Sequence, residues 1–347
     1  MKPVSTLHRA HSTQSSRVHD TNLVRTHRAS DVDEHAASLI DWNLSYDQLG
    51  RGSFAGQFTD IRLPGVQIFL ESTNQPVRQR GTLTQDSIGF AIMVSGQGTG
   101  ALNGLRFDNE SLLACRGTDM DLRTPAQCQL AGLVLDASLL DDATHQGDSD
   151  QHPVRPSSVA HLALKGAPAV RLRQVIHDTL ELANDTVRNA DDLTTRHWRD
   201  ELLDALAGVM NSTRPIGDVR RANERTRLVN AACQLMLSNT QDGTPQSLGE
   251  VCRQVGASPR KLGYCFQEVL GMSALEYMKA LRLNTVRREL RQATGSNTSI
   301  YDVATRHGFW HFGRFSVEYR QHFGERPSDT LRQAKSDLSQ PKFARYG

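Results

Sequence analysis

The sequence predicts an α+β protein in which an antiparallel β-rich region precedes a C-terminal all-α domain. From residue 57 to about 135, apolar and polar side chains alternate with a period of two, and Gly, Pro, Asn and Asp interrupt the runs at short intervals. Short strands between frequent turns are typical of an antiparallel sandwich or barrel. From about residue 159 onward, apolar side chains instead recur every three and four positions, which is typical of helices.

Length and composition narrow the class of protein. The chain has 347 residues, 38% of them hydrophobic and 22% charged, which suits about two globular domains. No apolar run approaches the roughly 18 residues that cross a bilayer, and the N-terminus lacks the apolar core of a secretory signal. Five cysteines with no CxxC pair suit a reducing compartment. We therefore expect a cytoplasmic protein that makes no contact with a membrane.

Composition also suggests where the parts of the chain begin and end. Residues 1–30 are polar and lack periodicity, so we expect a disordered tail. A β-rich domain follows over 31–150 and opens with a short helical segment. The Asp-, Pro- and Ser-rich stretch 141–158 reads as a linker. It leads into a helical region over 159–212 and a second helical domain over 222–334.

Charge is distributed unevenly along the chain. From Arg220 onward there are 20 Lys and Arg against 11 Asp and Glu, a balance of +9, whereas residues 1–219 carry 20 against 27. A basic C-terminal third indicates a polyanion as a partner. Ordinary variation of surface charge is the alternative, and charge alone does not decide between them.

Residues 247–270 have the pattern of a helix-turn-helix. An apolar stripe from Leu248 to Val255 is followed by the break Gly256-Ala257-Ser258 and by a second stripe from Leu262 to Leu270. Ser258 suits a helix N-cap, and Pro259 suits the first helical position. The outward positions of the second helix could enter a DNA major groove, and they are Arg260, Lys261, Gly263, Tyr264 and Gln267.

The same pattern recurs over 299–324, after a long predicted helix at 273–292. Phe315, Tyr319 and Phe323 form its core stripe, and Gly324 and Pro327 end the segment. The outward positions are His311, Phe312, Gly313, Arg314, Ser316 and Val317. Arg287, Arg288 and Arg291 on the long helix either contact DNA or form a solvated or salt-bridged face.

The stretch GFWHFGRFSVEYRQHFGERP (308–327) resembles the second-motif signature of the AraC/XylS transcription regulators, and residues 222–334 resemble their DNA-binding domain. This resemblance implies a sequence-specific transcription regulator, more often an activator than a repressor. It also implies a cupin-like, effector-sensing domain over 31–150 and a homodimer formed through the N-terminal part, for which 159–212 is the candidate element. Promoter DNA, RNA polymerase and a small-molecule effector are the implied partners.

In that family the first recognition helix usually reads base edges. By resemblance, Arg260 would pair with a guanine, Lys261 would contact a phosphate, and Tyr264 would contact a thymine methyl or a phosphate. The second helix carries Phe312, Gly313 and Val317, so we expect little direct base readout from it. Its role would be to hold the DNA backbone through Arg314, Ser316 and Arg320, with His311 beside them.

The effector is less well defined. Residues 31–61 resemble the ethanolamine-operon regulators within the family, a subgroup thought to sense ethanolamine with adenosylcobalamin as co-effector. Another amine, an amino acid or an aromatic compound is the alternative. Candidate pocket residues on the predicted strands are Arg78, Gln79, Phe90 and Met93.

We expect no other cofactor, no metal and no enzymatic activity. Between residues 31 and 150 the only histidines are His35 and His145, which are far from the HxH cluster of a metal-binding cupin. No nucleophile elbow, Walker A loop or HExxH occurs. More remote alternatives are an enzyme with a catalytic β-domain and a DNA-organising protein without a ligand.

Overall fold

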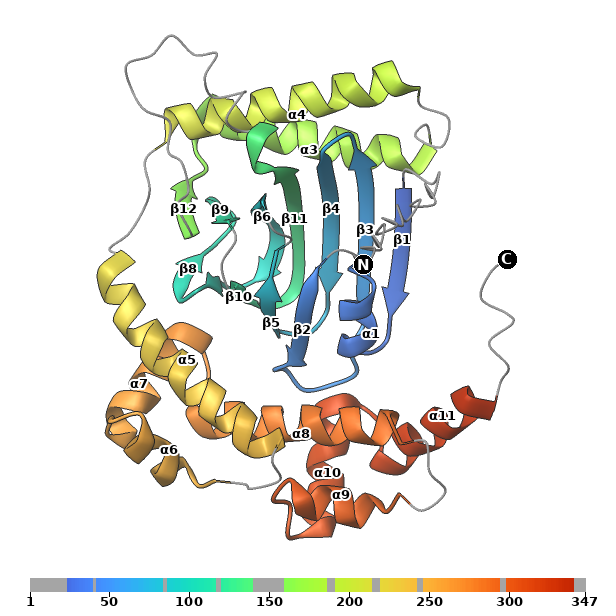
Figure 1. Ribbon diagram of the computed structural model, residues 1–347, viewed down its shortest axis with the longest axis vertical. Helices are drawn as coiled ribbons and strands as arrows, with labels where there is room; N and C mark the ends of the chain where they lie inside the picture. The colour runs from blue at the N-terminus through green and yellow to red at the C-terminus, as the bar shows by residue number, and fades with distance from the viewer. Residues whose placement is uncertain are drawn as a thin grey trace, which may run out of the picture.

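A computed structural model describes residues 24–39, 42–83, 86–116, 120–139, 159–185, 191–213, 219–241, 246–293 and 298–339. Antiparallel sheets form the N-terminal part and helices form the C-terminal part, as the sequence predicts (Figure 1). Residues 1–23 of the expected tail and the expected linker 141–158 lie outside the described residues.

The larger sheet has seven strands in the order β1-β3-β4-β11-β6-β9-β12, all paired antiparallel. Its strands are β1 (Val24–Ala29), β3 (Gly56–Leu63), β4 (Val66–Thr73), β6 (Ser87–Gln97), β9 (Ser111–Arg116), β11 (Ala126–Asp136) and β12 (Val159–Ala163). The smaller sheet runs β2-β5-β10-β7-β8. Its strands are β2 (Asn43–Gln48), β5 (Val77–Thr82), β7 (Gly100–Leu102), β8 (Leu105–Phe107) and β10 (Met120–Thr124).

The two sheets share their buried side chains. One cluster joins Leu130 of the larger sheet to Leu122 of the smaller, and a second joins Phe69 to Val77. The short helix α1 (Val32–Ala37) contributes Val32 to the second cluster. Its Asp31 N-cap accepts hydrogen bonds from the Asp33 and Glu34 amides, as N-cap carboxylates do.

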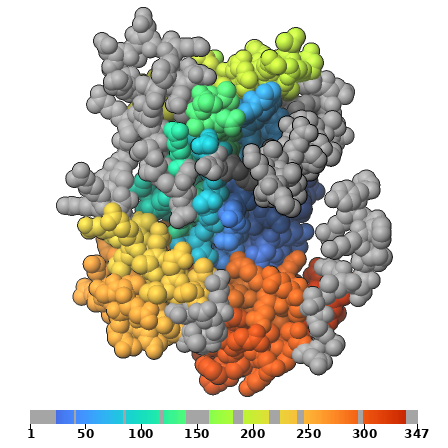
Figure 2. Space-filling view, viewed as in Figure 1, coloured from blue at the N-terminus to red at the C-terminus, as the bar shows by residue number. Residues whose placement is uncertain are grey.

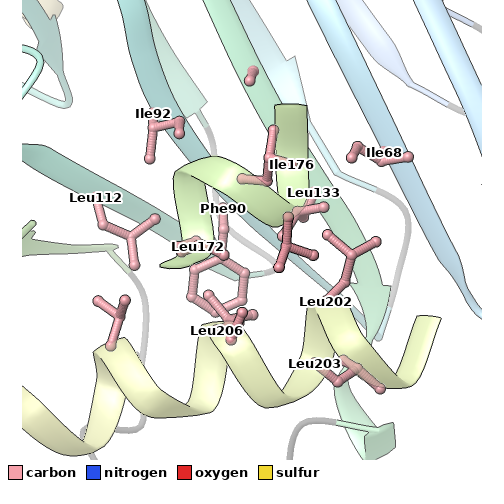
Figure 3. Close-up of a cluster of buried hydrophobic side chains, with 14 of the residues drawn as sticks. Ile68, Phe90, Ile92, Leu112, Leu133, Leu172, Ile176, Leu202, Leu203 and Leu206 are labelled. Atoms are coloured by element: carbon pink, nitrogen blue, oxygen red, sulfur yellow. The ribbon is translucent and has the colours of Figure 1, made fainter. Parts of the chain in front are cut away.

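Helices α3 (Gly166–Asp185) and α4 (Asp192–Ser212) cover the other face of the larger sheet. In Figure 3, Leu172 and Ile176 of α3 and Leu206 of α4 converge on strand residues that include Phe90 and Leu133. The apolar stripes that predict these helices are therefore buried against the sheet of the same chain.

Two strands lie where the sequence analysis predicts other structure. Val24–Ala29, inside the expected disordered tail, forms β1 and pairs with β3; Val159–Ala163, at the start of the expected helical region, forms β12 and pairs with β9. Both are short outer strands of the sheet. Their backbone hydrogen bonds come from a neighbouring strand distant in sequence, so local periodicity carries little trace of them.

The described residues of the C-terminal part form helices and the short turns between them. Its helices are α5 (Val219–Gln241), α6 (Leu248–Gln254), α7 (Pro259–Leu270), α8 (Ala274–Arg291), α9 (Ile300–Arg306), α10 (Phe312–Phe323) and α11 (Pro327–Ser339). One buried cluster lies among α5 to α8 and another among α8, α9 and α10. Phe266, Phe315 and Tyr319 are buried there, as expected of core side chains.

Strand β2 packs on α8, and β5 is hydrogen-bonded to α5; no space separates the two parts in the space-filling view (Figure 2). The helix pairs α6/α7 and α9/α10 lie at the opposite end of the molecule from α3 and α4 (Figure 1). Within the described part of the chain, no helix is both long enough and apolar enough to span a bilayer.

Candidate nucleic-acid interface

Helix α7 buries one face and leaves the other in solvent. Leu262, Phe266 and Val269 are buried, because they lie three to four residues apart and so share one side of the helix. Of the five candidate DNA-contacting residues of α7, four are exposed and Gly263 is half-buried; the exposed ones are Arg260, Lys261, Tyr264 and Gln267. The Ser258 side chain accepts a hydrogen bond from the Lys261 amide and fixes the start of the helix.

Tyr264 stands at the centre of this exposed face and is held in place. Its hydroxyl donates a hydrogen bond of 2.7 Å to Glu268 Oε1, and the Arg225 guanidinium lies 5.7 Å from the ring centre. The hydrogen bond to the Glu268 carboxylate raises the pKa of Tyr264. Tyr264 is 57% exposed, so an oriented phenol faces outward on the exposed side of α7, one turn after Arg260 and Lys261.

The exposed face of α10 combines cations with apolar side chains. His311, Arg314 and Arg320 are exposed and Ser316 is half-buried. Arg314 Nε lies 3.0 Å from Glu318 Oε1, whereas Arg320 has no carboxylate within 4.0 Å among the described residues. Val317 is 56% exposed and Phe312 is 40% exposed.

The arginines of α8 face the β-domain. Arg287 Nε lies 2.6 Å from Asp31 Oδ2, and Arg288 Nε lies 2.8 Å from Asp33 Oδ1. Arg288 also reaches Asp47 at 3.0 Å, and Arg291 reaches Asp31 at 3.4 Å. Of the two interpretations of these arginines, the salt-bridged face is the one observed.

These ion pairs perturb the carboxyl groups. Burial opposes ionisation of Asp31 and Asp47, but the neighbouring guanidinium groups outweigh it and lower the pKa of both residues. Both aspartates therefore remain charged near neutral pH.

A buried guanidinium forms a second contact between the parts. Arg78 of β5 is 1% exposed and donates to Asp121 of β10, with Nε at 2.7 Å from Oδ1. It also donates to the Tyr277 hydroxyl on α8 at 2.7 Å and to Asn230 on α5 at 3.2 Å. Tyr277 packs on Phe266 of α7, with ring centres 5.7 Å apart. Arg78 is therefore linked through Tyr277 to the core of the helix pair α6/α7.

The third contact joins β2 to the second helix pair. Asn284 of α8 accepts from the Gln48 amide and donates to the Gln48 carbonyl. The Gln48 side chain donates to the His322 carbonyl at 2.7 Å, and His322 Nε2 lies 3.1 Å from Gln48 O. Sequence reasoning missed Gln48, Asn284 and His322, because these partners are 236 and 274 residues apart and no local pattern marks them.

A small cavity of about 40 Å³ lies inside the β-domain. Gln79 and Phe90, two of the four pocket candidates, line it together with Leu113, Leu122 and Glu71. Arg78 belongs instead to the contact with the helices, and Met93 is a buried core residue.

Glu71 in the cavity wall accepts hydrogen bonds from three buried donors. They are His35 Nε2 at 2.9 Å, the Tyr46 hydroxyl at 2.8 Å and Gln79 Nε2 at 2.8 Å. Burial opposes its ionisation, but these donors outweigh it and lower the pKa of Glu71. The cavity wall therefore contains an ionised carboxylate. Among the described residues, no group of three or more His, Cys, Asp or Glu side chains could hold a metal ion.

Comparison with known proteins identifies the helical part. Residues 251–333, which run from α6 into α11, match the family model for the helix-turn-helix domain. This part of the chain is therefore a helix-turn-helix DNA-binding domain.

Two similar proteins indicate which type of helix-turn-helix domain this is. The chain is 39% identical over 88 residues to the "Probable thc operon regulatory protein" of Rhodococcus erythropolis, covering 25% of this chain and 26% of that protein. It is 37% identical over 93 residues to the XylDLEGF operon transcriptional activator of Pseudomonas putida, covering 27% and 29%. The domain is of the AraC/XylS type, as the sequence predicts.

These matches span only about a quarter of the length of either relative. They give no support to the expected resemblance of residues 31–61 to ethanolamine-operon regulators. Among solved structures, an AraC-type regulator from Chromobacterium violaceum is 29% identical and covers 36% of this chain and 98% of its own, with a TM-score of 0.30.

Proposed function

We propose that the full chain is a small-molecule-responsive transcription activator that binds promoter DNA through two helix-turn-helix units, α6/α7 and α9/α10. The observation that carries this is the pair of twelve-residue helices α7 and α10, which expose Arg260, Lys261, Arg314 and Arg320. Cations on an exposed helix supply contacts to phosphates, and a positioned arginine can read guanine.

The rigid connection through α8 supports a two-site geometry. Because α8 contributes core side chains to both helix pairs, it sets the distance between α7 and α10. Two recognition helices fixed in this way would enter successive major-groove segments about 34 Å apart on one face of the duplex.

We place the effector in the β-domain, which we take to be a cupin-like sandwich. Its cavity is lined mainly by apolar side chains, and its wall carries the ionised Glu71. No Lys, Arg or His lines it among the described residues, so an effector carboxylate would be buried without a cation. An uncharged or amine-bearing effector of only a few heavy atoms fits this cavity. Helices α3 and α4, which expose Val170 and Leu193, are our candidate for a homodimer surface, and RNA polymerase is the partner in activation.

Chromatin binding of the tagged protein and of Arg260→Ala tests the DNA-binding proposal. Sharp sites beside a small set of genes, whose transcription falls on deletion of the regulator, are the expected result. The substitution should weaken binding to the preferred operator by about 1–3 kcal/mol and relax the sequence preference at one base position.

Arg28→Ala is the matched control, because Arg28 is an exposed arginine on β1, outside the helices proposed for DNA binding and for the dimer. This variant should occupy the same chromatin sites to the same extent as the wild type. Diffuse occupancy by the wild-type protein, without change in transcription, would contradict the proposal and favour a DNA-organising protein.

Filling the cavity tests the effector site. Leu122→Trp should abolish the response of target genes to the effector while the purified protein keeps its operator affinity. A variant that still responds normally would place the effector elsewhere.

A further inference from the structure

The outward face of α10 has an apolar centre. Val317 follows the buried Phe315 by two residues, which is 200° around a helix, so it points directly away from the core. Gly313 precedes Val317 by one turn on the same face, and a Cβ placed on Gly313 would have no neighbour within 4 Å. The middle of this face therefore has no side-chain hydrogen-bonding group.

The corresponding centre of α7 is polar. Counting from the residue before each helix, Ser258 and His311, Val317 occupies the position of Tyr264 and Gly313 that of Arg260. Val317 is 56% exposed, so most of its side chain lies outside the folded core. Exposed apolar side chains grouped among cations mark contact surfaces.

The surroundings of Val317 suit a nucleic acid. The hollow that Val317 helps to line also contains Phe312, Ser316, Arg320 and Arg326, and no Asp or Glu among the described residues lines it. Two guanidinium groups and a hydroxyl beside an apolar patch match phosphates beside a base edge that carries a methyl group. Thymine is the one DNA base with such a group, the C5-methyl that lines the major groove.

We propose that Val317 reads a thymine methyl group in the major groove and that α10 thereby selects sequence. This inference rests on the proposed function, and it replaces the expectation that α10 only holds the DNA backbone. Gly313 leaves room for the base edge to approach, while Arg320 and Ser316 hold the flanking phosphates.

The test uses the full-length protein and a duplex selected by that protein from a random-sequence library. Each thymine of the selected site is replaced in turn by deoxyuridine, which removes only the methyl group. We expect one replacement, in the part of the site that α10 contacts, to lower the affinity of the wild-type protein for the duplex by about fourfold. This is the effect of one methyl group lost from an apolar contact. Val317→Ala should lose a similar factor on the unmodified duplex and show no further loss on the deoxyuridine duplex.

Val94→Ala is the control, because it truncates an exposed valine on β6, and it should respond to deoxyuridine as the wild type does. Equal deoxyuridine sensitivity in the wild type and Val317→Ala would overturn the inference while leaving the proposed function intact. Unchanged operator affinity of Val317→Ala with reduced transcription in cells would also overturn it and would assign the patch to a protein partner. If no duplex is enriched by the wild-type protein, the proposed function itself fails, and this inference fails with it.

Discussion

Helices α7 and α10 have the same length and the same C-terminal geometry but different outward chemistry. Each has twelve residues and ends at a glycine in the left-handed region, Gly271 with φ 67° and Gly324 with φ 79°. One presents a tyrosine flanked by Arg260, and the other presents a valine flanked by a glycine. The comparison shows that a repeated backbone unit can carry a hydrogen-bonding side chain at the centre of its exposed face on one copy and an apolar one on the other.

The two units also differ in how the β-domain holds them. The first is held by the buried guanidinium of Arg78, which lies between Asp121 and Tyr277. The second is held by the amide and carbonyl groups of Gln48 and by aspartate–arginine pairs that include Arg288. Arg78 is almost fully buried, whereas the Arg288 side chain is 24% exposed.

The largest loss of stability is expected from breaking the contact between the β-domain and the first helix-turn-helix unit, α6/α7. Arg78→Met leaves the Asp121 carboxylate and the Tyr277 hydroxyl without their shared partner, and loss of one member of a buried ion pair costs about 3–5 kcal/mol. Chemical denaturation should show this loss, and Arg288→Met should show a smaller one because water screens that pair. The double variant Arg78→Met/Asp121→Leu should recover most of the stability. Equal stability of the wild type and Arg78→Met would contradict this account.

The contact to the second unit should weaken in acid. Burial lowers the pKa of His322 from 6.5 to about 4, and Arg51, Arg287 and Lys279 act in the same direction. Between these two values the unfolded chain binds a proton that the folded chain does not. Stability should therefore fall as the pH falls from 6.5 to 4, by about 3 kcal/mol in all.

Thermal or chemical unfolding between pH 4 and 6.5 measures how the free energy of unfolding depends on pH. His322→Gln is the matched variant, because its side-chain amide can still donate to the Gln48 carbonyl but does not titrate. Its stability should depend less on pH over the same interval. An unchanged slope would assign the pH dependence to another group.

The smallest loss of stability is expected from substitutions at the N-termini of α7 and α10. Ser258 accepts a hydrogen bond from the Lys261 amide, so Ser258→Ala should lose about 1 kcal/mol of stability. His311 occupies the same position before α10 but makes no side-chain capping bond, so His311→Ala should change the free energy of unfolding very little. Equal losses would show that the two starts are not distinguished by capping.

Local patterns predicted the helical part well, because its residues contact near neighbours in the sequence. The apolar stripes, the Ser258 N-cap and the core positions of Phe266 and Phe315 all follow from spacings of three and four residues. The outer strands β1 and β12 were missed, since their partners lie far away in the chain. The contacts of Gln48 with Asn284 and His322 could not be found at all, because they exist only when the two parts meet.

The position of Arg78 shows the limit of strand periodicity. Arg78 and Gln79 are neighbours on β5, and alternation sends their side chains to opposite faces. Gln79 therefore lines the cavity, whereas Arg78 contacts α5 and α8. The sequence analysis named both residues as pocket candidates on a predicted strand, although alternation allows only one of them to face the cavity.

The pairing of α8 with the β-domain has a consequence for how such proteins can be recombined. The side chains of Asn284 and Arg288 are bonded across this contact to Gln48, Asp33 and Asp47 of the same chain. A chimaera that joins this DNA-binding domain to a foreign sensor would bury an amide and a guanidinium against surfaces that evolved without them. The β-domain and the DNA-binding domain are therefore expected to be inherited as a matched pair, and exchange of either one requires the facing residues to be exchanged with it.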